Sequence, residues 1–151
     1  MGIFNKDTFM DTPVQGANST QRLTFDPGVY PAVIEEVSVD NGEKDGREWA
    51  KLNLKLGFYD PEILAKMKRD KVSLTYGFFL DLTDLGTIDE GEGKNVPLGK
   101  VRKAVDQNRE GDGWTPRLLV GQQLLASVVA KPVLNSTDGE MRNEVVGISK
   151  L

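Results

Sequence analysis

Two segments, residues 49–58 and 72–80, alternate apolar residues with other side chains that include aromatic rings and, in the first segment, cations. Trp49, Lys51 and Lys55 take the positions opposite an apolar face in the first segment, and Phe79 takes an equivalent outer position in the second. Single-stranded nucleic acids bind where bases stack on flat rings, worth ~1–3 kcal/mol per base, and where cations contact the phosphates. These residues therefore predict a sequence-tolerant binding site for a single-stranded nucleic acid.

A second cationic set falls in a segment that the pattern predicts to be helical. Lys100, Arg102 and Lys103 are expected on its solvent side, where they are candidates for phosphate contacts. Charges on a helix often form only a solvated surface, so this alternative stays open. Trp49 has an alternative too, because exposed aromatic residues also mark contacts with a terminal arm or another subunit.

The composition removes several kinds of chemistry. The 151-residue chain has no histidine and no cysteine, so it lacks the commonest general base, the usual zinc ligands and any disulfide. We therefore expect no enzyme, no cofactor and no metal site. The formal net charge of -4 argues against a uniformly basic coat for nucleic acids. No apolar run approaches the ~18 residues that a membrane span needs, so no membrane contact is expected.

Carboxylates supply two further candidates, a catalytic pair and a calcium loop, and the sequence favours neither. Glu35 and Glu36 are neighbours in a predicted strand, so their side chains should point to opposite faces and form no catalytic pair. An EF-hand loop counted from Asp81 would need a ligand at its fifth position, where Leu85 stands. Residues 84–93 are therefore predicted to form a solvated acidic loop.

The elements that must position these residues follow from periodicity and turn signals. Alternation predicts strands at residues 29–39, 49–58 and 72–80 and a final hairpin within 118–148, with a polar turn at 41–46 and a bend or bulge at Gly77. Helices are predicted from the cap at Asp60 and from Asn95 to about Asn108. This order predicts a mainly β fold, a five-stranded Greek-key OB-like barrel with one or two helices. Residues 1–24 are predicted to be an N-terminal arm, flexible or interface-forming, and residues 25–151 the barrel domain.

Several of these segments resemble the tailed-phage single-stranded DNA-binding proteins with an OB-fold. The pattern consists of a Gly-Val-Tyr opening at residues 28–30, Pro-Leu-Gly-Lys-Val at 97–101, Leu-x-Gly-x-x-Leu-x-Ala-x-Val at 119–128 and Arg-Asn-Glu-Val at 142–145. It covers roughly residues 25–150. The resemblance implies a protein without catalysis that protects single-stranded DNA during phage replication or recombination, in the cytoplasm of the infected bacterial host.

The arm leads to an alternative. Phe4, Phe9 and Met10 could anchor it on a neighbouring subunit, giving a homo-oligomer. The chain also stops at Leu151 without the acidic tail of many replication proteins of this kind. The alternative is a virion structural protein, capsid-decorating or cementing, that would use a small β-barrel and the arm to grip the phage capsid protein.

Overall fold

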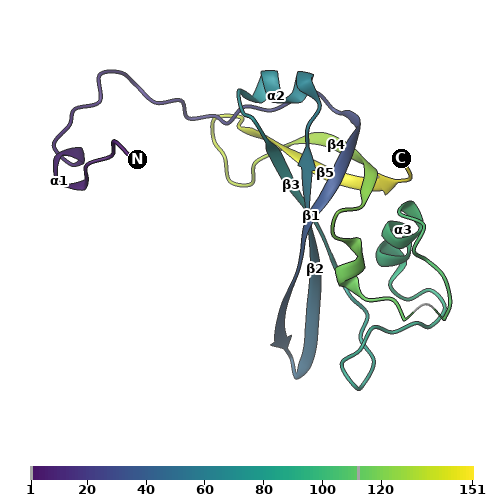
Figure 1. The fold of residues 1–151 in the computed structure, drawn as a ribbon. Helices are drawn as coiled ribbons and strands as arrows, with labels where there is room; N and C mark the ends of the chain where they lie inside the picture. Colours follow the sequence, from purple (N-terminus) through teal and green to yellow (C-terminus); the bar gives the residue numbers. More distant parts are fainter. Residues whose placement is uncertain (1, 112) are drawn as a thin grey trace.

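Five antiparallel strands form a single sheet in the order β3-β2-β1-β4-β5 (Figure 1). The computed structural model describes residues 2–111 and 113–151. The strands are β1 (Gly28–Lys44), β2 (Arg47–Phe58), β3 (Val72–Phe79), β4 (Gln123–Pro132) and β5 (Met141–Ser149). The helices are α1 (Lys6–Phe9), α2 (Pro61–Met67) and α3 (Val96–Ala104), with a 3-10 turn at Pro116–Leu119. The mainly β class is thereby confirmed.

The core lies on one face of the sheet. From Ala50 to Phe58 every second side chain of β2 is buried, as the alternation predicts, and Leu52, Leu54 and Leu56 are fully enclosed. Helix α3 adds Leu98 and Val101 to the same apolar cluster. The other face of β1, β2 and β3 therefore carries the side chains that alternate with the core, and α3 packs on the core side of the sheet.

The sheet is not closed. Strands β3 and β5, at its two ends, approach each other. No strand pairing joins them within the part of the chain that the structure describes. The predicted barrel is therefore not confirmed, and the established architecture is one five-stranded antiparallel sheet with its core on one side.

The hairpin of β1 and β2 is longer than the sequence predicts. Residues 41–44 continue β1 and pair with β2, so the polar turn shrinks to Asp45 and Gly46. Both turn residues have positive φ, 54° and 76°, which is the backbone of a two-residue type I′ turn. The hairpin therefore projects beyond the rest of the sheet, at the bottom of Figure 1.

A β-bulge corrects the prediction for the two adjacent glutamates. The register of β1 against β2 shifts between Ile34 and Glu36. Ile34 and Val37 both lie on the core side, so both Glu35 and Glu36 lie on the outer face instead of on opposite faces. Alternation alone could not reveal the extra residue.

Gly77 is not the predicted bend or bulge. The register of β3 against β2 runs through it without interruption, with Asn53 opposite. A Cβ atom at Gly77 would lie 2.5 Å from Asn53 Oδ1 and 2.8 Å from Lys51 Cε. The glycine therefore makes room for the side chains of β2 that cross over it.

The helices match the sequence in part. Asp60 caps α2 as predicted, accepting hydrogen bonds from the backbone N–H groups of Glu62 and Ile63. Helix α3 ends at Ala104 and not near Asn108, because Asp106 adopts a φ of 57° that breaks the helical path. Helix α1 was not predicted, and its start is fixed by Asn5, whose side chain accepts from two backbone N–H groups.

The N-terminal segment leaves the sheet and runs away from it, at the left of Figure 1. Residues 2–23 are all exposed. Its last part is fixed to the β4–β5 hairpin, where Arg22 pairs with Glu140 at 2.7 Å and Phe25 N–H donates to Asn143 Oδ1 at 3.0 Å. Among the described residues, no helix has both the length and the apolar character that a membrane crossing requires.

Candidate nucleic-acid interface

The predicted aromatic pair meets on the outer face of the sheet. Trp49 and Phe79 lie on neighbouring strands with ring centroids 5.9 Å apart and ring planes 73° apart. Lys51 is the cross-strand partner of Phe79, and its Nζ lies 5.6 Å from the centre of the Phe79 ring. The structure therefore brings together three of the four residues that head the sequence prediction.

A glycine in β1 holds the indole ring in place. Gly42 lies directly across from Trp49, and a Cβ atom at Gly42 would lie only 2.7 Å from the ring. The indole thus covers the bare backbone of Gly42 and is half-buried. Phe79 has no such cover and is 63% exposed, so it offers its ring to solvent or to a ligand.

Two further cations join this site, Lys44 from the predicted turn at 41–46 and Arg47 from just after it. A hollow of about 730 Å³ is lined by Lys44, Asp45, Arg47, Glu48, Trp49 and Phe79. The register pairs Lys44 with Arg47 and so places both on the same face as Trp49. The Asp-Gly dipeptide is the strongest short sequence signal for a two-residue hairpin turn. Pairing the residues on either side of that turn places Lys44 opposite Arg47, so the sequence did contain a signal for the position of both cations.

Lys55 lies further along the same face. Its Nζ lies 3.4 Å from Glu36 Oε2, so part of its charge is already balanced. Among the described residues, Lys44, Arg47 and Lys51 make no ion pair within 4.0 Å. The cations available to phosphate therefore gather at the Trp49 end of the face.

A polar cluster occupies the opposite end of that face, around Glu35. Its carboxylate accepts a hydrogen bond from the Tyr59 hydroxyl at 2.7 Å and pairs with Lys71 Nζ at 2.6 Å. Partial burial raises the pKa of Glu35, but the hydrogen bonds from Lys71 and Tyr59 outweigh burial and hold this pKa below its ordinary value. The hydrogen bond to Glu35 raises the pKa of Lys71. The carboxylate of Glu35 is therefore held in its ionised form by the hydrogen bond from Tyr59 and the ion pair with Lys71.

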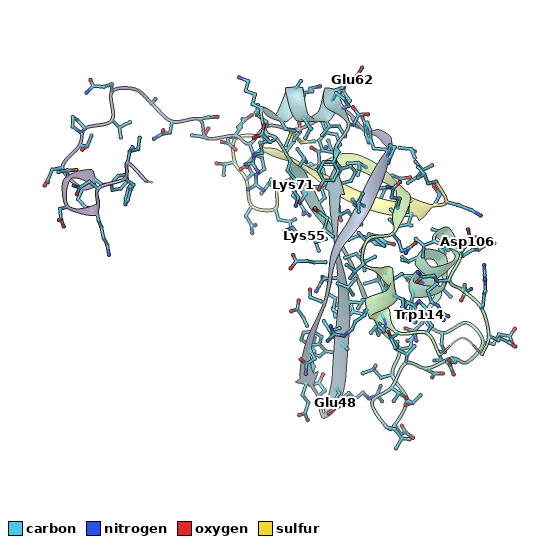
Figure 2. The ribbon with its side chains drawn as sticks, viewed as in Figure 1. Glu48, Lys55, Glu62, Lys71, Asp106 and Trp114 are labelled. Atoms are coloured by element: carbon cyan, nitrogen blue, oxygen red, sulfur yellow. The ribbon has the colours of Figure 1, made fainter. Side chains whose placement is uncertain are left out.

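The cations of α3 belong to a different side of the molecule. The helix packs on the core face of the sheet, whereas Trp49, Lys51 and Phe79 lie on the outer face. Figure 2 shows Trp114 beside α3 and Glu48 at the far end of the β1–β2 hairpin. Lys100, Arg102 and Lys103 therefore do not extend the aromatic site across one surface.

Arg102 was predicted to point to solvent, but in the structure it packs against Trp114. Its guanidinium lies 4.3 Å from the centre of the Trp114 ring, and its Nε and Nη2 donate to the carbonyl oxygen of Gln107. The indole N–H of Trp114 in turn donates to Gln107 Oε1 at 2.8 Å. This side chain therefore holds the segment after α3 in place, while Lys100 and Lys103 are exposed.

The acidic loop is organised by backbone contacts. Asp81 Oδ2 accepts the backbone N–H of Asn95, and Asp89 Oδ1 accepts that of Gly91. Within residues 2–111 and 113–151, no three potential ligands come close enough to hold a metal ion. Asp81 and Asp89 therefore act as acceptors for backbone N–H groups at the two ends of this segment.

No known family model and no curated protein matches this chain. The geometry of the candidate site is that of an aromatic pair on an exposed sheet face, beside cations that make no ion pair among the described residues.

Proposed function

We propose that this protein binds single-stranded DNA with little sequence preference and without catalysis, in phage replication or recombination. The observation that carries the proposal is the contact of Trp49, Phe79 and Lys51 on the outer face. Aromatic rings stack on any base, and cations beside them contact the phosphates, so such a site tolerates every sequence. Histidine and cysteine are absent from the chain, which favours binding over catalysis.

The strand order supports an OB-like fold as part of this proposal. Placing β4 beside β1, in the order β4-β1-β2-β3, is the arrangement of a Greek key. The OB-fold is a partly open Greek-key barrel that binds oligonucleotides on the face of its second and third strands and on the loop between the first two. Trp49 and Phe79 lie on β2 and β3, beside the β1–β2 turn. On this proposal the protein acts in the cytoplasm of the infected host.

The exposed arm favours a second candidate function. Its side chains Ile3, Phe4 and Met10 are more than two thirds exposed, at 102%, 68% and 82%. Apolar groups displayed on an extended segment suit a contact with another protein chain. The alternative is a virion structural protein whose arm grips the phage capsid protein, and a homo-oligomer joined by the arm is compatible with either function.

Fluorescence anisotropy of a labelled oligothymidine tests the first proposal. We expect binding that prefers the single strand over duplex DNA and weakens as salt rises, with log K falling by ~0.7 per phosphate neutralised for each tenfold increase in salt. Replacing both Trp49 and Phe79 by alanine should remove most of the affinity. Phe4→Ala is the matched control, because Phe4 is an exposed aromatic residue of the arm.

The outcomes separate the two functions. Salt-sensitive binding that is lost in the double variant and kept in the control supports DNA binding. If the wild-type protein shows no binding to the oligothymidine even at high protein concentration, the DNA-binding proposal is contradicted. In that case co-sedimentation with phage capsids, compared between the full chain and a chain without residues 2–22, tests the structural role.

A further inference from the structure

A second hollow, of about 1040 Å³, lies beside α3 and has no part in the aromatic site. Its wall includes the exposed side of the helix, the segment before it and the segment that follows it. Among the described residues, five cationic side chains and three acidic ones line it. The cations are Lys94, Lys100, Arg102, Lys103 and Arg109, and the acids are Asp89, Glu90 and Glu110.

Four of the five cations have no anionic partner. Lys94, Lys100, Lys103 and Arg109 make no ion pair within 4.0 Å among the residues that the structure describes. Arg102 is occupied by its own contacts with Trp114 and the Gln107 carbonyl oxygen. The hollow therefore presents four cations that form no ion pair with any acid among the described residues.

A glycine keeps one wall of this hollow bare. Gly99 lies within α3, where glycine weakens a helix relative to alanine. Its φ is not positive, and a Cβ atom built on it would have nothing within 4 Å. Neither backbone conformation nor packing in the chain requires glycine here. A bare backbone at the wall does allow close approach of a ligand.

Hydrogen bonds at the end of β3 connect the strand that carries Phe79 to the wall of the hollow. Asp81 lies two residues beyond Phe79 and exchanges hydrogen bonds with Asn95, which lines the hollow. Asp81 N–H donates to Asn95 Oδ1 at 2.8 Å, and Asn95 N–H donates to Asp81 Oδ2 at 2.8 Å. Asn95 is itself 7% exposed, so this joint is part of the packed structure. To run from Phe79 to the hollow, a single strand has to pass around the end of β3.

We propose that the hollow beside α3 is a second phosphate-binding site, which takes the continuation of a single strand that stacks on Trp49 and Phe79. This inference rests on the proposed DNA binding and extends it. Lys94, Lys100, Lys103 and Arg109 contact the phosphates, and Gly99 admits the backbone of the strand. An acidic protein segment would also suit the cations, but the Asp81–Asn95 hydrogen bonds that join the end of β3 to the hollow favour the nucleic acid.

Two oligothymidines of different length separate this site from the aromatic one. Single-strand sites on one OB-like domain span about 4 to 16 nucleotides, so a strand of about five should occupy the aromatic site alone and one of about twelve should extend to the hollow. Replacing Lys100 and Lys103 by alanine should weaken binding of the longer strand by about 5- to 30-fold. It should also lower the salt slope of log K by about 1.4 and leave the short strand unaffected.

The control removes the same charge elsewhere. Lys6→Ala combined with Arg69→Ala removes one cation from the arm and one from the segment after α2. Neither cation pairs with an acid among the described residues. Both oligothymidines should then bind alike to the control and the wild type. If the control and the Lys100/Lys103 variant weaken binding of the longer strand equally, the effect comes from net charge alone. That result would overturn the proposal.

Gly99→Leu tests the same site without changing charge. The open space around Gly99 accepts a side chain, so the thermal midpoint should not fall. The longer strand should bind more weakly and the short strand as before. If Gly99→Leu and the Lys100/Lys103 variant both bind the longer strand as tightly as the wild type does, the second site is contradicted. The proposal for the aromatic site is unaffected by that result.

Two further outcomes also count against it. If neither oligothymidine binds the wild type, the proposed function fails and the second site fails with it. If an oligoglutamate peptide binds with a dependence on Lys100 and Lys103, and does so while the longer strand is bound, the hollow belongs to an acidic protein segment.

Discussion

At the scale of single residues, Phe79 is the most accessible part of the aromatic site. Phe79→Ala removes a ring that is 63% exposed and should cost about 1–3 kcal/mol of binding, or about 5- to 150-fold in affinity for an oligothymidine. The fold should tolerate the change, because the side chain lies outside the core. Anisotropy gives the affinity and thermal unfolding gives the stability. Unchanged affinity would remove Phe79 from the site.

Gly42 controls the position of the Trp49 ring. A Cβ atom at Gly42 would lie 2.7 Å from the indole, so Gly42→Ala must push the ring away from β1. We expect the indole to become more exposed, its fluorescence to shift to the red and the affinity for an oligothymidine to fall. Gly46→Ala is a useful comparison, because it strains the turn at a φ of 76° without contacting the ring. An unshifted spectrum in Gly42→Ala would contradict this packing.

Glu35 should make the free energy of unfolding depend on pH in the acidic range. Its pKa is lower in the folded protein than in the unfolded chain, because the hydrogen bonds from Lys71 and Tyr59 outweigh partial burial. Its contribution is therefore complete above the unfolded value of about 4.5 and is lost as pH falls through the folded value. Denaturant unfolding between about pH 3 and 6 should show a smaller loss of stability in Glu35→Gln than in the wild type. Parallel curves would contradict a lowered pKa.

At the scale of elements, Arg102 ties α3 to the segment that follows it. Arg102→Ala loses the contact with the Trp114 ring and two hydrogen bonds to the Gln107 carbonyl oxygen. We expect a loss of about 1–3 kcal/mol, which lowers the thermal midpoint by several degrees. Arg102→Lys should not restore it, because an ammonium group lacks the planar shape that stacks on the ring. Full rescue by lysine would mean that charge alone matters.

Element lengths explain why part of the site was not predicted. The polar residues 41–44 carry no apolar alternation, yet they pair fully with β2 because the Asp45-Gly46 turn fixes the register. The extra length places Lys44 and Arg47 beside Trp49. The bulge after Ile34 likewise moves Glu35 to the outer face, where it pairs with Lys71. A hydrophobic pattern reports burial, and these backbone features change pairing without changing the pattern.

At the scale of the whole molecule, the arm and the sheet should be separable. Residues 2–23 are exposed, and deleting residues 2–22 removes from the domain the Arg22–Glu140 pair and the Gln21 hydrogen bond to the Asp138 carbonyl oxygen. The stability of the sheet should fall by no more than about 1 kcal/mol. Affinity for an oligothymidine should stay the same, and any self-association seen by sedimentation should weaken. Loss of DNA binding on deletion would place the arm in the site.

The sequence by itself determined the mainly β class, the buried face of β2, the cap of α2 and the outward side of Trp49, Lys51 and Phe79. Each of these depends on neighbours in sequence, through a two-residue period or a local hydrogen bond. The strand order, the open sheet, the bulge and the separation of the α3 cations from the aromatic site depend on contacts between distant residues. Only the tertiary structure decided them, because strand pairing and the side on which a helix packs are not encoded in the period of any one segment.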